Sequence, residues 1–110
     1  MLKRSLIVAI VLALGAPTAI AANAFETVIV IKDHRFQPDE IKVPAGQQLK
    51  LVIDNQDATP EEFESHNLRI EKIVPGNSKA TIRIEPLKAG EYRFVGEFNE
   101  DTAKGKLVAE

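Results

Sequence analysis

Apolar and polar residues alternate along much of the chain, with the period of two that is typical of β-strands buried on one face. Residues 49–54 read Leu-Lys-Leu-Val-Ile-Asp, and residues 81–85 read Thr-Ile-Arg-Ile-Glu. The β-branched run at 27–31, the alternation at 91–94 and the closing apolar run at 107–109 have the composition of further strands. The pattern therefore predicts a protein made mainly of short strands.

Turn-forming residues separate these runs. Proline, glycine, asparagine and aspartate gather at 44–46, 55–57, 75–77 and 88–90. Short strands divided by turns at this spacing predict an all-β fold, an antiparallel β-sandwich. Only residues 60–65 suggest helix, and there no more than a single turn.

The N-terminus has the features of a secretory signal peptide. Residues 3–4 are basic, residues 6–14 are apolar, and small residues end in an Ala-x-Ala sequence. The apolar run is shorter than the ~20 residues of a membrane span, and a glycine and a proline follow it. We therefore predict a cleaved signal at 1–24, a periplasmic location, and a single domain at 25–110 that does not itself span the membrane. A retained membrane anchor is the alternative.

Net charge and sulfur content limit the partners and the metal ligands that can be expected for this protein. Two of the 14 basic residues leave with the signal, so the net charge goes from −2 to −4. A mildly acidic surface with mixed charges argues against nucleic acid as a partner. The chain has no cysteine, and its one methionine is Met1. The mature protein would therefore contain no sulfur ligand for a metal.

Several motifs, by their order and spacing, resemble the cupredoxin family: Phe36-x-Pro38-x-x-Ile41-x-Val43-x-x-Gly46, His66-Asn67, Gly90-x-Tyr92-x-Phe94 and Gly105-x-Leu107-Val108. The stretches FESHNL and GEFNEDTAKG are most similar to the small, cysteine-free EfeO-type cupredoxin-like domains associated with periplasmic iron uptake. The resemblance implies a Greek-key β-sandwich with one copper between loops at one end. It also implies a periplasmic or inner-membrane iron-transport protein as partner.

The resemblance also assigns ligand positions. It places the family's first histidine ligand at His66, the cysteine at Gly96, the second histidine at Asn99 and the methionine near Ala103. Three of these four ligands are absent. Since a blue copper site needs thiolate donation, the resemblance implies that this protein has no such site.

Four other side chains are candidates for a metal site without sulfur. Glu64 and His66 are two residues apart, so on an extended segment they point to one face. In the resembled fold, Glu97 lies in a loop beside His66, and His34 lies in the first hairpin connection at the same end. Nitrogen and oxygen donors suit Cu(II), Fe(II) or Zn(II), and affinity normally favours copper.

Each candidate also has a purely structural interpretation. His34 is then a solvated turn residue and His66 a strand-end residue bonded to backbone, while Glu64 and Glu97 are hydrated loop carboxylates. We expect four further acidic residues to be solvated charge at the rim: Glu61, Glu62, Glu100 and Asp101. Tyr92 follows a turn glycine by two residues, which resembles the tyrosine corner of Greek-key sandwiches and indicates a role in stability.

The sequence favours an exported copper-binding protein that serves iron uptake by electron transfer, Fe(II) oxidation or metal delivery. A metal-free sandwich that docks in a periplasmic complex is the alternative, because three family ligands are missing. Motifs of other enzyme classes are absent from the sequence: Ser65 and His66 are adjacent, so on a strand they face opposite sides and cannot act as nucleophile and base.

Overall fold

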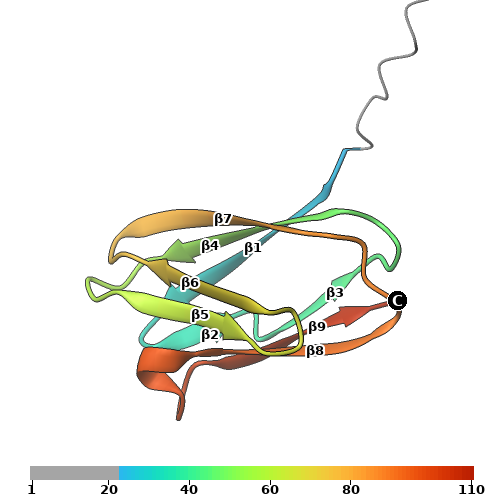
Figure 1. Ribbon diagram of the computed structural model, residues 1–110. Coiled ribbons are helices and arrows are strands. Elements are labelled where there is room, and N and C mark those ends of the chain that lie inside the picture. Colours follow the sequence, from blue (N-terminus) through green and yellow to red (C-terminus); the bar gives the residue numbers. More distant parts are fainter. Residues whose placement is uncertain (1–22) are drawn as a thin grey trace, which may run out of the picture.

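Two β-sheets packed face to face make up the molecule (Figure 1). The computed structural model describes residues 23–110, so all but the last two residues of the predicted signal peptide lie outside the described residues. One 3-10 turn, η1 (Glu97–Asn99), accompanies nine strands in this part of the chain: β1 (Phe25–Lys32), β2 (Arg35–Gln37), β3 (Glu40–Val43), β4 (Leu49–Asn55), β5 (Glu61–Ser65), β6 (Ile70–Val74), β7 (Ser78–Ile84), β8 (Gly90–Gly96) and β9 (Lys104–Ala109).

The strand order confirms the predicted β-sandwich. One sheet has the order β2-β1-β4-β7, and the other has the order β3-β9-β8-β5-β6. Most neighbouring strands are antiparallel, as expected, but β1 pairs with β4 and β3 pairs with β9 in parallel. The last strand, β9, therefore lies inside its sheet, between β3 and β8.

The alternating residues of the strands form the core between the sheets. Leu49, Leu51 and Ile53 of β4 are at most 1 % exposed, as the period of two requires. Phe63 and Phe94 face them from the other sheet, and their ring centroids lie 5.0 Å apart. The ring of Phe36 packs edge-on against both phenylalanines, so one aromatic group fills the centre of the sandwich.

The helical turn expected at residues 60–65 is wrong, because this segment forms β5. The strand pairs with β6 on one side and with β8 on the other. Pairing on both sides satisfies the backbone of β5, and the buried Phe63 fixes which face points inward. Glu62 and Glu64 consequently point to the outer face of the five-stranded sheet.

Asn55 joins the turns at one end of the sandwich. Its side chain is fully buried, and its Nδ2 donates to the carbonyl oxygens of Thr59 at 2.9 Å, Val74 at 3.2 Å and Pro75 at 3.3 Å. Its Oδ1 accepts a hydrogen bond from the backbone N–H of Asp57. One amide group thereby fixes both the loop that leads into β5 and the turn that follows β6.

The tyrosine corner predicted at Tyr92 is confirmed. The Tyr92 hydroxyl donates to the backbone carbonyl of Lys88, four residues upstream, at 2.8 Å. The bond closes the connection between β7 and β8 over the edge of the sandwich.

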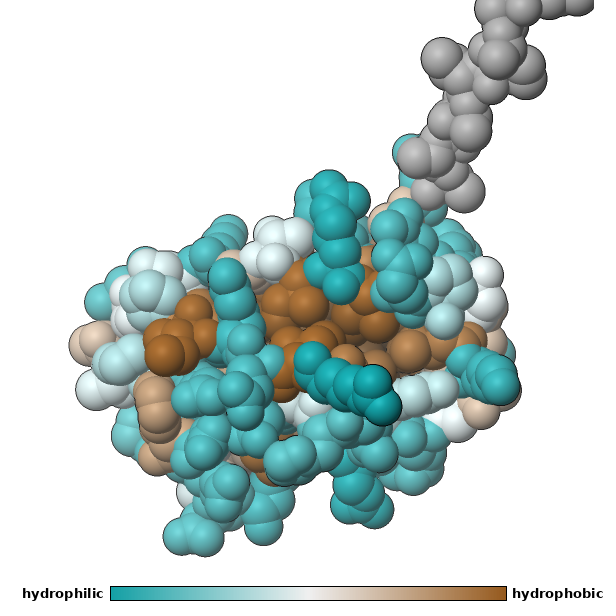
Figure 2. Space-filling view, in the orientation of Figure 1, coloured by the Kyte–Doolittle hydropathy of each residue, from teal (hydrophilic) through white to brown (hydrophobic). Residues whose placement is uncertain are grey.

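Figure 2 shows apolar side chains between polar ones on the face of the sandwich that is toward the viewer in Figure 1. A groove of about 410 Å³ lies between the β5–β6 turn and the end of β7, and its apolar lining includes Leu68, Ile70, Ile84 and Leu87. Among residues 23–110, no helix has the length and apolarity needed to cross a bilayer.

Candidate metal centre

Four glutamates meet on the outer face of the five-stranded sheet. Glu62, Glu64, Glu71 and Glu97 each offer one carboxylate oxygen, and these four oxygens all lie within 4.8 Å of one another. We call this group the outer acidic cluster. Its members come from β5, β6 and η1, so the fold assembles the cluster from segments up to 35 residues apart in the sequence.

Strand register accounts for the meeting. Glu62 and Glu64 are alternate residues of β5 and therefore share a face. Glu71 of β6 lies directly opposite Glu64 in the antiparallel pair. Because Phe63 pairs with Gly96, the end of β8 lies beside β5, and the next residue, Glu97, reaches the same place.

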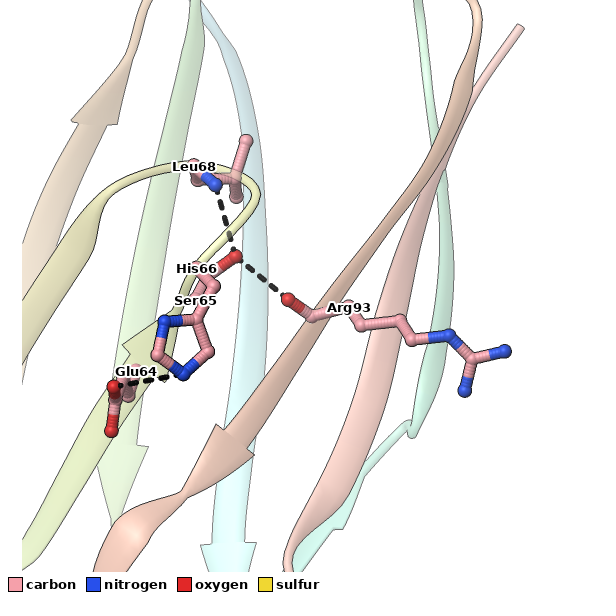
Figure 3. Close-up of polar contacts among 5 residues, drawn as sticks. All are labelled: Glu64, Ser65, His66, Leu68 and Arg93. Atoms are coloured by element: carbon pink, nitrogen blue, oxygen red, sulfur yellow. Dashed lines mark hydrogen bonds and ion pairs between the residues drawn. The ribbon is translucent and has the colours of Figure 1, made fainter.

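His66 adds an imidazole to the rim of this cluster. Its Nε2 lies 3.3 Å from Glu64 Oε1 while the His66 side chain is 91 % exposed. Figure 3 shows the ring turned toward Glu64, whereas the hydroxyl of the neighbouring Ser65 points toward Arg93. Ser65 Oγ donates to the Arg93 carbonyl and accepts from the Leu68 N–H, so it holds the β5–β6 turn and is not paired with the imidazole.

The close packing of these glutamates raises the pKa of two of them, Glu62 and Glu64. A hydrogen bond shared with Glu97 raises the pKa of Glu64 above its ordinary value of 4.5, and burial of Glu64 adds to the increase. Desolvation, followed by the contact with Glu97, raises the pKa of Glu62. These pKa shifts mean that the cluster resists full ionisation. A bound proton or cation would reduce the repulsion, whereas the nearby His66 lowers the pKa of Glu64 by less than the contacts with Glu97 raise it.

We expect the metal-free protein to lose stability as the pH rises from 4.5 toward neutrality. A carboxyl group with a raised pKa in the folded state retains its proton longer there than in the unfolded chain, so folding is favoured at low pH and this advantage disappears through the window above 4.5. Thermal unfolding in a chelator across that window measures the effect.

The variant Glu97→Gln isolates this contribution. It removes the carboxyl group whose hydrogen bond and charge raise the pKa of Glu64 and add to the desolvation that raises the pKa of Glu62, so the melting temperature should fall less steeply with pH than that of the wild type. The hydrogen bond from Lys106 lowers the pKa of Glu91, which gives this pair the opposite pH dependence. The pair is the same in wild type and variant, so it does not contribute to the difference between their slopes. Equal slopes for wild type and variant would contradict the prediction.

Glu61 lies on the other side of β5 and is buried, with 1 % exposure. Its Oε1 accepts from the backbone N–H groups of Glu62 at 3.0 Å and Phe98 at 2.9 Å. Its Oε2 accepts from Asn99 Nδ2 at 2.7 Å. The expectation that Glu61 is solvated is therefore wrong, because its carboxyl group is an internal hydrogen-bond acceptor for the start of the loop between β8 and β9.

The four residues to which the resemblance assigns ligand positions do not all meet in the structure. Gly96, Asn99 and Ala103 do come together, but the residue from β5 that meets them is Glu61, five residues before His66. A Cβ atom on Gly96 would lie 2.6 Å from the Glu61 carboxyl carbon and 2.7 Å from Ala103 Cβ. His66 lies on the outer side of the sheet with Glu64.

The remaining candidate, His34, stands apart from the outer acidic cluster. Its Nε2 lies 3.5 Å from Thr59 Oγ1, and its carbonyl accepts from the hydroxyl of Thr102. His34 and Glu97 line one shallow hollow beside η1. The structure thus brings Glu64, Glu97 and His66 into one neighbourhood and leaves His34 at its edge.

Sequence reasoning missed two members of the cluster, Glu62 and Glu71. The signal that could have identified them is the β5–β6 hairpin, in which a four-residue turn, His66–Arg69, places residue 64 opposite residue 71. Because residues 60–65 were expected to form a helical turn, the pairing of residue 64 with residue 71 in a β-hairpin could not be predicted.

Comparison with known proteins gives one family and a consistent fold. A model of the cupredoxin-like domain family matches residues 5–109. The uncharacterized protein RP394 of Rickettsia prowazekii (strain Madrid E) is 45 % identical over 86 residues, which cover 78 % of this chain and 69 % of that protein.

Solved structures with low sequence identity share the fold. Auracyanin A, a blue copper protein of Chloroflexus aurantiacus, is similar with a TM-score of 0.68 and 16 % identity, over 80 % of this chain and 100 % of that one. The metal-binding domain of the Cu(I)-exporting P-type ATPase CopA of Streptococcus pneumoniae D39 gives a TM-score of 0.69 and 15 % identity, over 77 % of this chain and 84 % of that one.

Proposed function

The chain belongs to the cupredoxin-like domain family, and from this premise we propose that it binds one transition-metal ion, copper before iron or zinc, at the outer acidic cluster. Glu64 and Glu97 are the central ligands of this proposal, Glu62 and Glu71 complete the carboxylate set, and His66 supplies a nitrogen. His34 lies too far to the side to be assigned more than a place at the rim of the site.

The observation that carries the proposal is the convergence of four carboxylate oxygens within 4.8 Å of one another, with an imidazole nitrogen of His66 3.3 Å from Glu64 Oε1. Such a group is electrostatically unfavourable without a cation, as the raised pKa values of Glu62 and Glu64 indicate. A divalent ion would remove the repulsion and use oxygen and nitrogen donors that suit Cu(II), Fe(II) and Zn(II).

The proposed site is not a blue copper site. The chain contains no cysteine, and its single methionine is at position 1. Copper held by carboxylates and an imidazole would lack the thiolate that defines blue copper centres. The ligands are hard donors, so the site would favour Cu(II) over Cu(I), which suits metal delivery better than reactions that cycle copper between the two oxidation states.

Titration with Cu(II) tests the proposal. We expect one saturable site in the wild type and, in Glu64→Gln, an affinity lower by about 100-fold or more, because loss of even an outer partner of a metal ligand costs 10–100-fold. Glu64 is the least exposed member of the cluster, and its substitution by the isosteric amide removes a charged ligand while preserving volume. Calorimetry with Zn(II), and with Fe(II) under anaerobic conditions, ranks the metals.

Glu100→Gln is the matched control. Glu100 is an exposed glutamate in the loop between β8 and β9 and is not a member of the outer acidic cluster, while its substitution makes the same change in net charge. We expect an affinity within about twofold of the wild type. If Glu64→Gln and Glu100→Gln bind copper equally well, or the wild type binds none, the proposal is wrong.

We further propose that the chain acts in the periplasm after removal of residues 1–24 and serves iron uptake with an iron-transport protein as partner. The similarity of FESHNL and GEFNEDTAKG to the EfeO-type domains supports this role. Growth of a deletion strain on limiting iron, complemented by wild type or Glu64→Gln, tests it. Oxygen consumption with Fe(II) and substoichiometric copper distinguishes an oxidase from a delivery protein.

A metal-free docking module is the second candidate. The observation in its favour is that Glu61 lies among Gly96, Asn99 and Ala103, the positions at which the family resemblance places ligands. In this case the outer acidic cluster would recognise a basic protein surface. Unchanged complementation by Glu64→Gln, together with absence of saturable metal binding, would favour it.

A further inference from the structure

We infer that the interior position where the family carries copper is closed in this protein, and that the Glu61 carboxyl group takes the metal's place in tying the loop between β8 and β9 to β5. We call residues 97–103 the β8–β9 loop. The inference concerns a buried group on the inner side of β5 and holds whether or not the outer acidic cluster binds a metal.

The groups that surround this position do not supply the donors that copper needs. A copper ion needs several donor atoms directed at one point, and thiolate or imidazole donors for its usual sites. Here Gly96 and Ala103 offer no donor side chain, and the Asn99 amide presents its N–H group to Glu61 at 2.7 Å. The one strong ligand group, the Glu61 carboxyl, already accepts three hydrogen bonds. The residues present do not fit copper.

The Glu61 carboxyl group also fills the space beside Gly96. The Glu61 carboxyl carbon would lie 2.6 Å, and its Oε2 2.8 Å, from a Cβ atom on Gly96, and Ala103 Cβ is equally close. Real Cβ atoms essentially never approach other atoms so closely, so the glycine is what makes room for the carboxyl group. A cysteine at position 96 and the present Glu61 side chain exclude each other. Glycine and glutamate therefore form a complementary pair.

Glu61 also connects β5 to the β8–β9 loop by hydrogen bonds. A metal in this family would join β5 to the loop after β8, and Glu61 makes the same connection by hydrogen bonds. Its Oε1 holds the Phe98 N–H and its Oε2 holds the Asn99 side chain, both in η1. The loop then closes on itself, because the N–H of Gly96 donates to the carbonyl of Ala103. In the described part of the chain, each buried side-chain nitrogen and oxygen has a hydrogen-bond partner.

Exchanging the two side chains tests the connection. In Asn99→Asp two carboxylates must face each other, whereas in Glu61→Gln the Asn99 amide can turn over and present its Oδ1 to the new N–H group. The double variant Glu61→Gln/Asn99→Asp restores one donor and one acceptor, while the amide oxygen introduced at position 61 would still accept from the Phe98 N–H. We expect Asn99→Asp to lower the melting temperature by roughly 5–15 °C, Glu61→Gln to lower it by less, and the double variant to recover at least half of the loss caused by Asn99→Asp.

Metal binding is tested with the outer acidic cluster removed. The variant Glu64→Gln/Glu97→Gln leaves Glu61 and its partners in place, and we expect it to retain no saturable Cu(II). Copper retained by this variant and lost on adding Glu61→Gln would overturn the inference. A wild type that binds no copper at all would contradict the proposed function and leave this inference standing.

Hydrogen exchange provides a measurement that needs no variant. The Phe98 amide, which donates to Glu61, should already be protected in a chelator, with no metal bound. Protection that appears only with the metal would show that an ion, and not the carboxyl group alone, fixes the β8–β9 loop, and would overturn the inference. A double variant Glu61→Gln/Asn99→Asp that is no more stable than Asn99→Asp alone would also overturn the inference.

Discussion

Replacing Phe63 by alanine is expected to lower the free energy of unfolding by about 3–5 kcal/mol, a large share of the 5–15 kcal/mol that holds a domain folded. Phe63 is fully buried, and its ring packs against both Phe36 and Phe94. The substitution removes the centre of this aromatic group and leaves a cavity. Phe63 also fixes the face of β5, so the outer acidic cluster depends on it.

Denaturant unfolding of wild type and variant at constant pH measures this loss. Phe98→Ala is the matched control, because it makes the same chemical change at a side chain that is 50 % exposed. We expect that control to lose less than about 1 kcal/mol. Equal losses for the two phenylalanines would mean that the aromatic group is not the centre of the core.

Asn55→Ala is expected to cost about 2–4 kcal/mol, although it deletes only a small polar side chain. The Nδ2 group serves the carbonyls of Thr59, Val74 and Pro75, and the Oδ1 serves the Asp57 N–H. Removing the amide leaves these backbone groups without their partner in a buried place. Leaving buried polar groups unpaired is the costly part of the change.

Chemical denaturation, with hydrogen exchange at the Asp57 amide, measures the effect of Asn55→Ala. Asn67→Ala is a suitable control, since Asn67 is exposed and accepts one 3.2 Å hydrogen bond from the Arg93 N–H. We expect the control to stay within about 1 kcal/mol of the wild type. A loss at Asn55 no greater than the loss at Asn67 would refute its role as the junction between two turns.

The fold was accessible from the sequence because its strands are amphipathic. The alternation at 49–54 and 81–85 predicted β4 and β7, and Tyr92 after Gly90 predicted the tyrosine corner. Pairing partners were not accessible, since a period of two specifies a buried face and not a neighbour. The parallel pairs of β1 with β4 and of β3 with β9 therefore emerge only in the structure.

The candidate site was accessible in part. Glu64 and His66 were paired correctly by their spacing of two, and the family resemblance brought Glu97 to them. The segment 60–65 was the source of the errors, because consecutive glutamates after a proline look like a solvated turn. Burial of Glu61 depends on Gly96 and Asn99, some 35 residues away, and no local pattern records such a complementary pair.

The inner position of β9 has a consequence for the order in which the protein can fold. A chain synthesised from its N-terminus presents β3 long before its neighbour exists, because residues Lys104–Ala109 lie about 60 residues further along the chain. β8 likewise lacks its hydrogen-bonding partner on one side until β9 has been made. The five-stranded sheet can therefore close only after β9 has been made, which makes its folding late relative to the synthesis of β3.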